Sequence, residues 1–338
     1  MIHFQENFSL LDFNTFGVDA KARYFFEFTD LSDLQVFLKS NGSWKEEKYL
    51  ILGGGSNLLF QNDFDGLIIH PNVPGINSIK EDRQNVWLEV GAGVVWDEFV
   101  EYCVVSELGG IENLSLIPGS VGAAPVQNIG AYGREASQFI ETVIGLDLET
   151  LETKQISAED CGFGYRDSIF KTKLKNRFVV TSVIFKLEKF PEFEMSYGLV
   201  EQEVKKLGGA SLRNIRKAII DIRNSKLPDP EVYGNAGSFF KNPVVDGYIV
   251  SNLKAEYADM PVYPADGDKL KLAAGWLIDQ CGWKGFRAGD AGVHEKQALV
   301  IINHGNATGE ELFKLSEKIK ASVKEKFGIC LEREVNVI

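Results

Sequence analysis

The chain has 338 residues, 44% of them hydrophobic and 25% charged, which is the composition of an ordinary globular protein long enough for two or three domains. The net charge of −12 at pH 7 argues against nucleic acid or an anionic membrane surface as the main partner, although a local basic pocket can still bind a small anion. No apolar stretch approaches the ~20 residues that span a bilayer, and the start of the chain has no basic segment followed by an apolar run. We therefore expect neither a membrane anchor nor a secretory signal.

The four cysteines lie far apart in the sequence, at Cys103, Cys161, Cys281 and Cys330. None forms a CxxC pair, so we predict no zinc or redox motif and no metal site. Together with the missing secretory signal, this indicates a cytoplasmic protein with reduced thiols. No long exposed apolar stripe demands a partner, so we expect a monomer.

In chain order, the hydrophobic pattern predicts short strands and amphipathic helices, which alternate in the first third of the chain. The predicted strands cover residues 24–28, 49–52, 67–70, 86–90, 142–147, 178–187, 298–303 and 328–338. The predicted helices cover residues 31–38, 96–108, 199–206, 212–222, 270–281 and 308–327. Ser211 is expected to cap the fourth of these helices, and Thr308 with Glu311 forms a capping box at the last. A proline-rich break at residues 225–230 predicts a domain boundary near residue 228.

The first of two glycine-rich loops, residues 53–57, reads Gly-Gly-Gly-Ser-Asn and directly follows a buried strand. This arrangement resembles phosphate-binding loops in outline. It is not a Walker loop, because no Gly-Lys-Ser/Thr follows, and not a dinucleotide fingerprint, because Leu58 stands where that pattern needs glycine. The alternative is a tight turn at the end of the strand.

The second loop, residues 117–133, holds four glycines and two adjacent alanines together with Gln127, Asn128 and Tyr132. Glycine lets a ligand approach the main chain and lets several N–H groups converge on an anion or a ring edge. We interpret this stretch as a cofactor cradle. The alternative is a long loop with a structural role only.

Two other turns carry reactive or charged side chains. Tyr165 and Arg166 lie on a glycine-flanked loop, where the planar guanidinium suits a substrate carboxylate, unless the loop is only a polar surface turn. Ser238 follows Ala-Gly and precedes two phenylalanines, which makes it a candidate reactive hydroxyl. Its surroundings do not match Gly-x-Ser-x-Gly and no histidine is spaced as its base, so a hydrolase is disfavoured. Gln280 lies off the apolar stripe of its predicted helix and can face a site.

Seven motifs occur in a fixed order along nearly the whole chain. They are Asn-Thr-Phe-Gly at 14–17, Gly-Gly-Gly-Ser-Asn at 53–57, Pro-Gly-Ser-Val-Gly at 118–122 with Gln-Asn-Ile-Gly-Ala-Tyr-Gly at 127–133, Tyr-Arg at 165–166, Ala-Gly-Ser-Phe-Phe-Lys-Asn-Pro at 236–243, Ala-Gly-Trp-Leu-Ile-Asp-Gln at 274–280 and Leu-Glu at 331–332. Each alone has little specificity. Together the chain closely resembles the UDP-N-acetylenolpyruvoylglucosamine reductases of bacterial peptidoglycan synthesis.

The resemblance implies an α+β protein with a two-part FAD-binding fold of the vanillyl-alcohol-oxidase (PCMH) type and a separate α+β substrate-binding domain. We expect one FAD-binding subdomain at residues 1–70 and a second at 71–227, which is joined by the C-terminal strand 328–338. The substrate-binding domain is expected at residues 228–327.

The resemblance also implies the reaction. The family reduces the enolpyruvyl ether of UDP-N-acetylglucosamine to the lactyl ether, giving UDP-N-acetylmuramate, with electrons passed from NADPH through non-covalent FAD. Hydride from flavin N5 goes to the terminal carbon and Ser238 gives a proton to the adjacent carbon. Arg166 and Glu332 are expected at the substrate carboxylate. Because an ionised Glu332 would repel the developing enolate, we infer that it is protonated or that it holds a donor in place.

Other site residues are carried over from the family motifs. Tyr197, in Met-Ser-Tyr-Gly at 195–198, matches a tyrosine on the extra loop of one family subtype, where the loop closes over the substrate diphosphate. The expected substrate-binding residues are Tyr165, Tyr197, Lys226, Asn242 and Gln280. The expected FAD-binding residues are Gly53, Gly54, Gly55, Ser56, Asn57, Pro118, Gly119, Ser120, Gly122, Ala123, Gln127, Asn128, Gly130, Ala131, Tyr132 and Gly133.

Two alternatives belong to other functional classes. One is an oxygen-dependent flavin oxidase on the same fold with a different substrate, which leaves the motifs at 236–243 and 331–332 unexplained. The other is a flavin- or nucleotide-binding regulatory module without turnover, which would need no proton donor such as Ser238.

Overall fold

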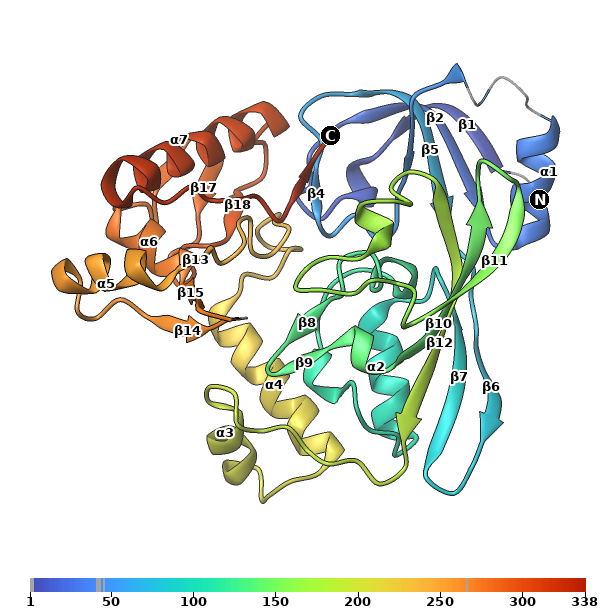
Figure 1. Cartoon of the computed structure of the whole chain (residues 1–338). Helices are drawn as coiled ribbons and strands as arrows, with labels where there is room; N and C mark the ends of the chain where they lie inside the picture. The colour runs from blue at the N-terminus through green and yellow to red at the C-terminus, as the bar shows by residue number, and fades with distance from the viewer. Residues whose placement is uncertain (1–2, 41–43, 45, 266) are drawn as a thin grey trace. The chain divides into compact units, whose positions relative to one another are not determined.

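The computed structural model describes residues 3–40, 44, 46–265 and 267–338 (Figure 1). The chain divides into two compact units, and it passes between them several times. Unit 1 comprises Met1–Phe8, Ala22–Gly55 and Asp65–Ser225, and unit 2 comprises Ser9–Lys21, Ser56–Phe64 and Lys226–Ile338. Both units mix helices and strands, as expected for an α+β protein.

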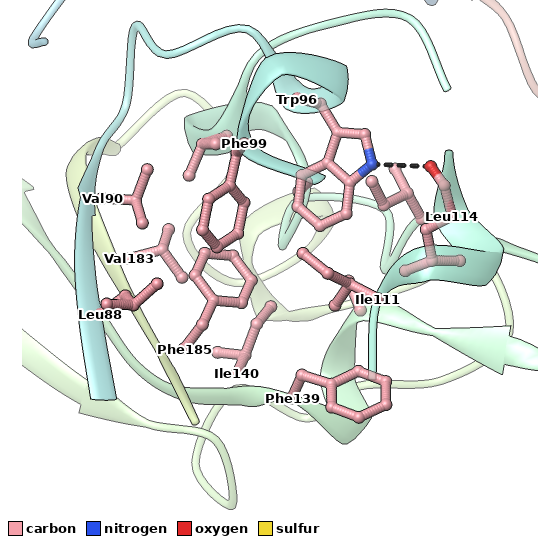
Figure 2. Packing of buried hydrophobic residues seen from close by; sticks show 14 of the residues in the cluster. Leu88, Val90, Trp96, Phe99, Ile111, Leu114, Phe139, Ile140, Val183 and Phe185 are labelled. Carbon is pink, nitrogen blue, oxygen red and sulfur yellow. Dashed lines mark hydrogen bonds between the residues drawn. The ribbon is translucent and has the colours of Figure 1, made fainter. Parts of the chain in front are cut away.

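The larger sheet of unit 1 is five-stranded and antiparallel, in the order β11-β10-β12-β7-β6. Its strands are β6 (Ile76–Glu81), β7 (Asn85–Gly91), β10 (Ile140–Asp147), β11 (Glu152–Ser157) and β12 (Phe178–Glu188). Helix α2 (Trp96–Val105) packs its apolar stripe on the core formed by β7, β10 and β12 (Figures 1 and 2). Trp96 and Phe99 are both fully buried there, and the rings of Phe99 and Phe185 lie 4.8 Å apart. The predicted strands 86–90, 142–147 and 178–187 are confirmed.

The second sheet has the order β1-β2-β5-β3. Its strands are β1 (His3–Ser9), β2 (Lys21–Phe28), β3 (Tyr49–Ile51) and β5 (Phe64–Pro71), and helix α1 (Leu31–Ser40) follows β2. Phe37 of α1 stacks on Phe26 of β2 with ring centroids 3.9 Å apart, because both lie on the apolar faces of their elements. The predicted strands 24–28, 49–52 and 67–70 and the helix 31–38 are confirmed.

Helices α3 (Val200–Lys206) and α4 (Leu212–Lys226) match the prediction, and Ser211 accepts a hydrogen bond from the N–H of Asn214 at 3.1 Å, as an N-cap does. The guanidinium of Arg216 on α4 makes a bidentate contact with the Asp97 carboxylate on α2, at 2.7 and 2.9 Å. This ion pair connects the two helices within unit 1. Short strands β8 (Gly130–Ala131) and β9 (Arg134–Glu135) form a hairpin at the end of the second glycine-rich loop.

Unit 2 contains two three-stranded sheets, ordered β13-β15-β14 and β16-β17-β18. The strands are β13 (Val244–Asp246), β14 (Val262–Pro264), β15 (Lys269–Leu272), β16 (Arg287–Ala288), β17 (Ala291–Val293) and β18 (Ile301–Asn303). The helices are α5 (Gly247–Glu256), α6 (Ala274–Gln280) and α7 (Gly309–Phe327), and Thr308 with Glu311 forms the predicted capping box of α7.

Three predicted boundaries in unit 2 are wrong. The predicted helix at 270–281 begins only at Ala274, because Leu270 belongs to β15, where the sequence Lys-Leu-Lys-Leu alternates with the period of a strand. The predicted strand at 298–303 shortens to Ile301–Asn303. The predicted last strand at 328–338 shortens to β19 (Asn336–Val337), which pairs in parallel with β4 (Leu58–Leu59). That pairing groups residues 328–338 with unit 2.

Among the described residues no helix is long and apolar enough to cross a membrane. All four cysteines are free thiols, with Cys103 and Cys161 buried and Cys330 exposed.

A buried carboxylate on β10 generates a stability prediction. The Asp147 side chain is fully buried and accepts hydrogen bonds from Arg177 at 2.8 and 2.9 Å and from Lys154 at 2.6 Å. The Arg177 contact lowers the pKa of Asp147 in the folded protein, so its stabilisation is present at neutral pH and is lost as the pH falls below the unfolded value of about 3.9. We expect Asp147→Asn to lower the free energy of unfolding by about 1–3 kcal/mol at pH 7. This deficit relative to the wild type should shrink below about pH 4.

The matched control is Glu149→Gln. Glu149 is paired with the same arginine at 2.7 Å, but its side chain is 66% exposed, so its removal should cost at most about 1 kcal/mol. Urea unfolding of both variants at pH 7 and at about pH 2.5 measures the difference. Equal losses for the two variants, or a deficit of Asp147→Asn that grows in acid, would contradict this account.

Candidate active site

The two glycine-rich loops meet backbone to backbone within unit 1. A Cβ built on Gly54 would lie 3.0 Å from the Cα of Gly119 and 3.3 Å from the amide nitrogen of Ser120. A Cβ on Gly53 would lie 3.0 Å from the Ser120 hydroxyl oxygen and 3.3 Å from the Ala123 methyl carbon. Position 54 therefore favours glycine, because a Cβ there would press on another backbone and not on a flexible side chain.

This contact leaves a group of amide donors without protein acceptors. In the described part of the chain, no protein group accepts a hydrogen bond from the N–H groups of Gly53, Gly54, Gly55, Gly119 and Ser120. Converging backbone N–H groups at a turn are a common binding arrangement for phosphate. The loops thus fit the pyrophosphate of a dinucleotide cofactor. Ser56 and Asn57, the remaining residues of the first loop, belong to unit 2, where the N–H of Asn336 donates to the Asn57 carbonyl at 3.1 Å.

Glycines further along the second loop have packing roles. A Cβ on Gly122 would lie 2.6 Å from the Ala92 methyl carbon, so this glycine lets the loop lie flat on the end of β7. Gly119 adopts φ 121° and Gly133 φ 84°, in the left-handed region that favours glycine. The same loop also contains Pro118, Gln127, Ala131 and Tyr132, and Ala131 lies in β8.

The second loop is joined to the Tyr165–Arg166 turn. The Asn128 amide donates to the Gly164 carbonyl at 3.2 Å and to Glu135 Oε2 at 2.8 Å, and the buried Ser168 hydroxyl donates to the Val126 carbonyl at 2.6 Å. Asn128 thus holds the turn against the loop. The family resemblance predicts that Asn128 contacts the cofactor, but it does not indicate this structural role.

The guanidinium of Arg166 points at the same loop. Its Nη2 donates to the Gly130 carbonyl at 2.6 Å, and its Nη1 donates to the Asn128 carbonyl at 3.4 Å. Tyr165 is 40% exposed, and the Arg166 guanidinium lies 5.5 Å from its ring centroid. Arg166 itself has φ 55°, on a turn closed by hydrogen bonds between Gly164 and Asp167. The structure therefore brings Tyr165 and Arg166 to the end of the glycine-rich loop.

Tyr197 is the other expected substrate contact of unit 1. It is 54% exposed, and its ring meets the ring of Tyr132 edge-on at 6.1 Å. Burial raises the pKa of the Tyr132 phenol, which therefore stays neutral at physiological pH.

In unit 2, Ser238 lies on a half-buried turn that follows Gly237, a residue with φ 67°. The Asn235 side chain accepts from the Gly237 N–H at 3.0 Å and fixes this turn. Ser238 then pairs with Val300 through a single β-bridge. Within the described residues, the Ser238 hydroxyl has no protein hydrogen-bond partner, which leaves it available to a ligand.

Glu332 lies directly opposite Lys241, a residue that sequence reasoning did not single out. The Lys241 N–H donates to the Glu332 carbonyl at 2.9 Å, and the Lys241 ammonium contacts Glu332 Oε1 at 2.5 Å. The Lys241 side chain is 20% exposed, whereas the Glu332 side chain is 72% exposed. The signal for Lys241 was present, because it stands three residues after Ser238 in the same motif.

Asn242, Lys226 and Gln280 also lie in unit 2 but have different surroundings. The Asn242 Oδ1 atom accepts from the N–H of Ala274 at 3.0 Å, so it fixes the start of α6 and leaves the amide donors for a ligand. Lys226 is exposed at the C-terminal end of α4, and Gln280 is exposed at the end of α6. No contact joins these three side chains to one another within the residues that the structure describes.

Comparisons with known proteins agree on both halves of the chain. Residues 229–338 match the model of the UDP-N-acetylenolpyruvoylglucosamine reductase C-terminal domain, and residues 23–155 match an FAD binding domain. A UDP-N-acetylenolpyruvoylglucosamine reductase of Flavobacterium johnsoniae is 47% identical over 337 residues, covering 99% of each chain. One from Bacteroides fragilis is 47% identical over 334 residues, covering 99% of this chain and 100% of the relative.

A solved structure has the same fold. The crystal structure of UDP-N-acetylenolpyruvylglucosamine reductase from Thermus caldophilus superposes with a TM-score of 0.69 at 24% identity and covers 100% of this chain and 98% of its own. Together with the FAD binding domain, this confirms the expected two-part FAD-binding fold of the vanillyl-alcohol-oxidase type.

The contact between the glycine-rich loops can be tested through cofactor affinity. We expect Gly54→Ala to weaken FAD binding about tenfold or more, because forcing a methyl group into close-packed backbone costs about 1–3 kcal/mol. Titration of the apoprotein with FAD, followed by the quenching of flavin fluorescence, measures the dissociation constant.

The matched control is Gly247→Ala at the start of α5, where a Cβ would make only an ordinary contact at 3.4 Å. This variant should bind FAD as the wild type does. Wild-type affinity of Gly54→Ala would show that the loops do not depend on this close approach.

Proposed function

Because the chain belongs to the UDP-N-acetylenolpyruvoylglucosamine reductase family, we propose that it uses FAD and NADPH to reduce the enolpyruvyl ether of UDP-N-acetylglucosamine to the lactyl ether. The observation that carries this proposal is the match of 47% identity over 99% of the chain to a reductase of that name. The unpaired N–H groups of the glycine-rich loops support non-covalent FAD as the cofactor. NADPH as the electron donor is part of the proposal.

The chemistry requires stabilisation of negative charge and delivery of one proton. The glycine-rich loops at 53–57 and 117–133 would hold FAD, which in its reduced form would supply a hydride to the terminal carbon of the enolpyruvyl double bond. Negative charge then spreads into the substrate carboxylate, where the fixed cation of Arg166 is expected to bind it. The Gly130 and Asn128 carbonyls orient the Arg166 guanidinium through Nη2 and Nη1.

Ser238 is the proposed proton donor to the carbon next to the carboxylate. A serine hydroxyl is a weak acid, so its alkoxide must be stabilised while the proton moves, and backbone N–H groups or Lys226 are candidates for that role. The left-handed Gly237 and the bridge to Val300 fix the backbone that carries the hydroxyl. A positioned general acid of this kind typically contributes a factor of ~10²–10⁴ to the rate.

The ion pair with Lys241 favours one of the two roles considered for Glu332. A carboxylate held at 2.5 Å from an ammonium group carries its charge together with a compensating cation. We therefore propose that Glu332 holds a donor in place and that Lys241 is this donor. The Lys241–Glu332 pair brings no net negative charge to the enolate.

Three of the remaining residues are proposed to bind the substrate diphosphate: Lys226 through its cation, Tyr197 through its phenol and Asn242 through its amide. Tyr165 and Gln280 are proposed to bind the substrate elsewhere. The proposed domain limits are FAD-binding subdomains at 1–70 and 71–227 with 328–338, and a substrate-binding domain at 228–327. A cytoplasmic monomer is likewise part of the proposal, supported by the four free thiols.

An oxygen-dependent oxidase on the same fold is disfavoured, because residues 229–338 match the C-terminal domain of the reductases. A binding module without turnover is disfavoured by the relatives named as reductases.

Steady-state kinetics with purified holoprotein tests the proposal. NADPH oxidation should require the enolpyruvyl nucleotide, and UDP-N-acetylglucosamine, which has no enolpyruvyl group, should not replace it. The product should be two hydrogens heavier than the substrate by mass spectrometry. NADPH oxidation that depends on oxygen instead of the nucleotide would contradict the proposal and favour the oxidase.

The role of Ser238 predicts an effect on one half-reaction. In Ser238→Ala, reduction of the flavin by NADPH should keep its wild-type rate, whereas reoxidation by the enolpyruvyl nucleotide should slow by ~10²–10⁴-fold. Rapid-mixing absorbance spectroscopy separates the two steps. Ser251→Ala is the control, because that hydroxyl only donates to the Gly247 carbonyl within α5. Equal slowing of both half-reactions in Ser238→Ala would point to a general structural defect.

A further inference from the structure

We infer that Asn113 is a positioning residue that couples the cofactor loop to the segment carrying Tyr197. The inference rests on the proposed function for the role of Tyr197 at the substrate diphosphate. Nothing in the seven sequence motifs includes Asn113. Its importance follows from hydrogen bonds that only the folded chain reveals.

The Asn113 side chain connects two segments that are far apart in the sequence. It is fully buried, and its amide nitrogen donates to the Tyr132 carbonyl and to the Glu194 carbonyl, both at 2.8 Å. The Asn113 amide group thus donates both of its protons to backbone carbonyl groups. One acceptor lies at the end of the glycine-rich loop, and the other lies three residues before Tyr197.

The turn that carries Asn113 is anchored in the core of unit 1. Asn113 is the middle residue of the short 3-10 helix η3 (Glu112–Leu114). The Trp96 indole N–H donates to the Leu114 carbonyl at 2.9 Å, a bond drawn in Figure 2, and the Trp96 backbone N–H donates to the Gly119 carbonyl at 2.9 Å. The same buried tryptophan therefore fixes both the Asn113 turn and the cofactor loop.

Further contacts join the same two segments. Arg134 Nη2 donates to the Glu192 carbonyl at 2.9 Å. A Cβ on Gly133 would lie 2.9 Å from Glu194 Cγ, so Gly133 allows the segments to lie in direct contact. The edge-on contact of Tyr132 with Tyr197 completes this interface.

Glu194 fixes the conformation of the chain just before Tyr197. Its Oε1 atom accepts from the Ser196 N–H at 2.8 Å and from the Ser196 hydroxyl at 2.5 Å, which closes a tight local turn. Tyr197 is the next residue in the chain. Because Asn113 holds the Glu194 carbonyl, it sets where this turn, and with it the Tyr197 phenol, lies relative to the cofactor loop.

The variant Asn113→Leu keeps the branched shape and the number of non-hydrogen side-chain atoms and removes both donors. We expect the KM for the enolpyruvyl nucleotide to rise about tenfold, a loss of about 1.4 kcal/mol in binding, with kcat changed much less. Amide hydrogen exchange of the holoprotein should be faster in residues 190–199 and unchanged in β7 and β12. If Asn113→Leu does not accumulate as holoprotein, Asn113→Ser takes its place, because a serine hydroxyl can reach at most one of the two carbonyls.

A control variant and a double variant separate positioning from general destabilisation. Ser182→Ala also removes a buried side-chain hydrogen bond in unit 1, from its hydroxyl to Glu89 Oε1 at 2.8 Å, but it lies away from the Tyr197 segment and should leave the KM unchanged. In a Tyr197→Ala background, Asn113→Leu should add no further increase in KM, because the two residues act through one group. An additive effect, or a KM equal to that of the wild type in Asn113→Leu, would overturn the inference.

Turnover and hydrogen exchange test the proposed function and the role of Asn113 separately. If the protein does not turn over the enolpyruvyl nucleotide at all, the proposed function fails, while hydrogen exchange in residues 190–199 still decides whether Asn113 holds that segment. If turnover is normal and exchange in 190–199 is the same in Asn113→Leu as in the wild type, the inference fails and the proposed function stands.

Discussion

The close approach of Gly54 to Gly119 is the constraint on which the proposed cofactor site depends. Two loops more than sixty residues apart meet through their main chains, so closely that a Cβ on Gly54 would make a tight contact with the backbone of Gly119. Among the described residues, no protein group accepts a hydrogen bond from the N–H groups of Gly53, Gly54, Gly55, Gly119 and Ser120. Backbone dipoles carry no net charge, so a pyrophosphate site of the proposed kind is compatible with a chain whose net charge is −12.

The core of unit 1 supports this arrangement from one side. Trp96 donates one hydrogen bond from its backbone to Gly119 and one from its indole to Leu114, so the cofactor loop and the turn before it are attached to the same helix. Arg166 in turn donates to the carbonyl groups at the other end of the loop. These two hydrogen bonds orient the guanidinium that is proposed to bind the growing negative charge.

Much of the fold was readable from the sequence, because long amphipathic segments such as 309–327 and alternating ones such as 178–187 have a clear period. Leu270 was misassigned because a short apolar pattern fits both a strand and a helix, and the start of α6 is fixed by Asn242, a residue 32 positions earlier. Lys241 and Asn113 were not singled out because their contacts join residues that are distant in the sequence. Their partners, Glu332, Tyr132 and Glu194, are brought to them only by pairing and packing across long sequence separations. The site motifs could be recognised in the sequence because each is a short segment, in which the turn itself calls for glycine and polar residues.

The central claim is that electrons pass from NADPH through FAD bound at the glycine-rich loops to the enolpyruvyl nucleotide. Anaerobic rapid mixing of the purified protein, with NADPH added first and the nucleotide second, tests it in one trace of flavin absorbance. The account predicts bleaching by NADPH and full recovery of the oxidised spectrum when the nucleotide is added. A protein that purifies without flavin, or a reduced flavin that stays bleached in the presence of the nucleotide, would contradict it.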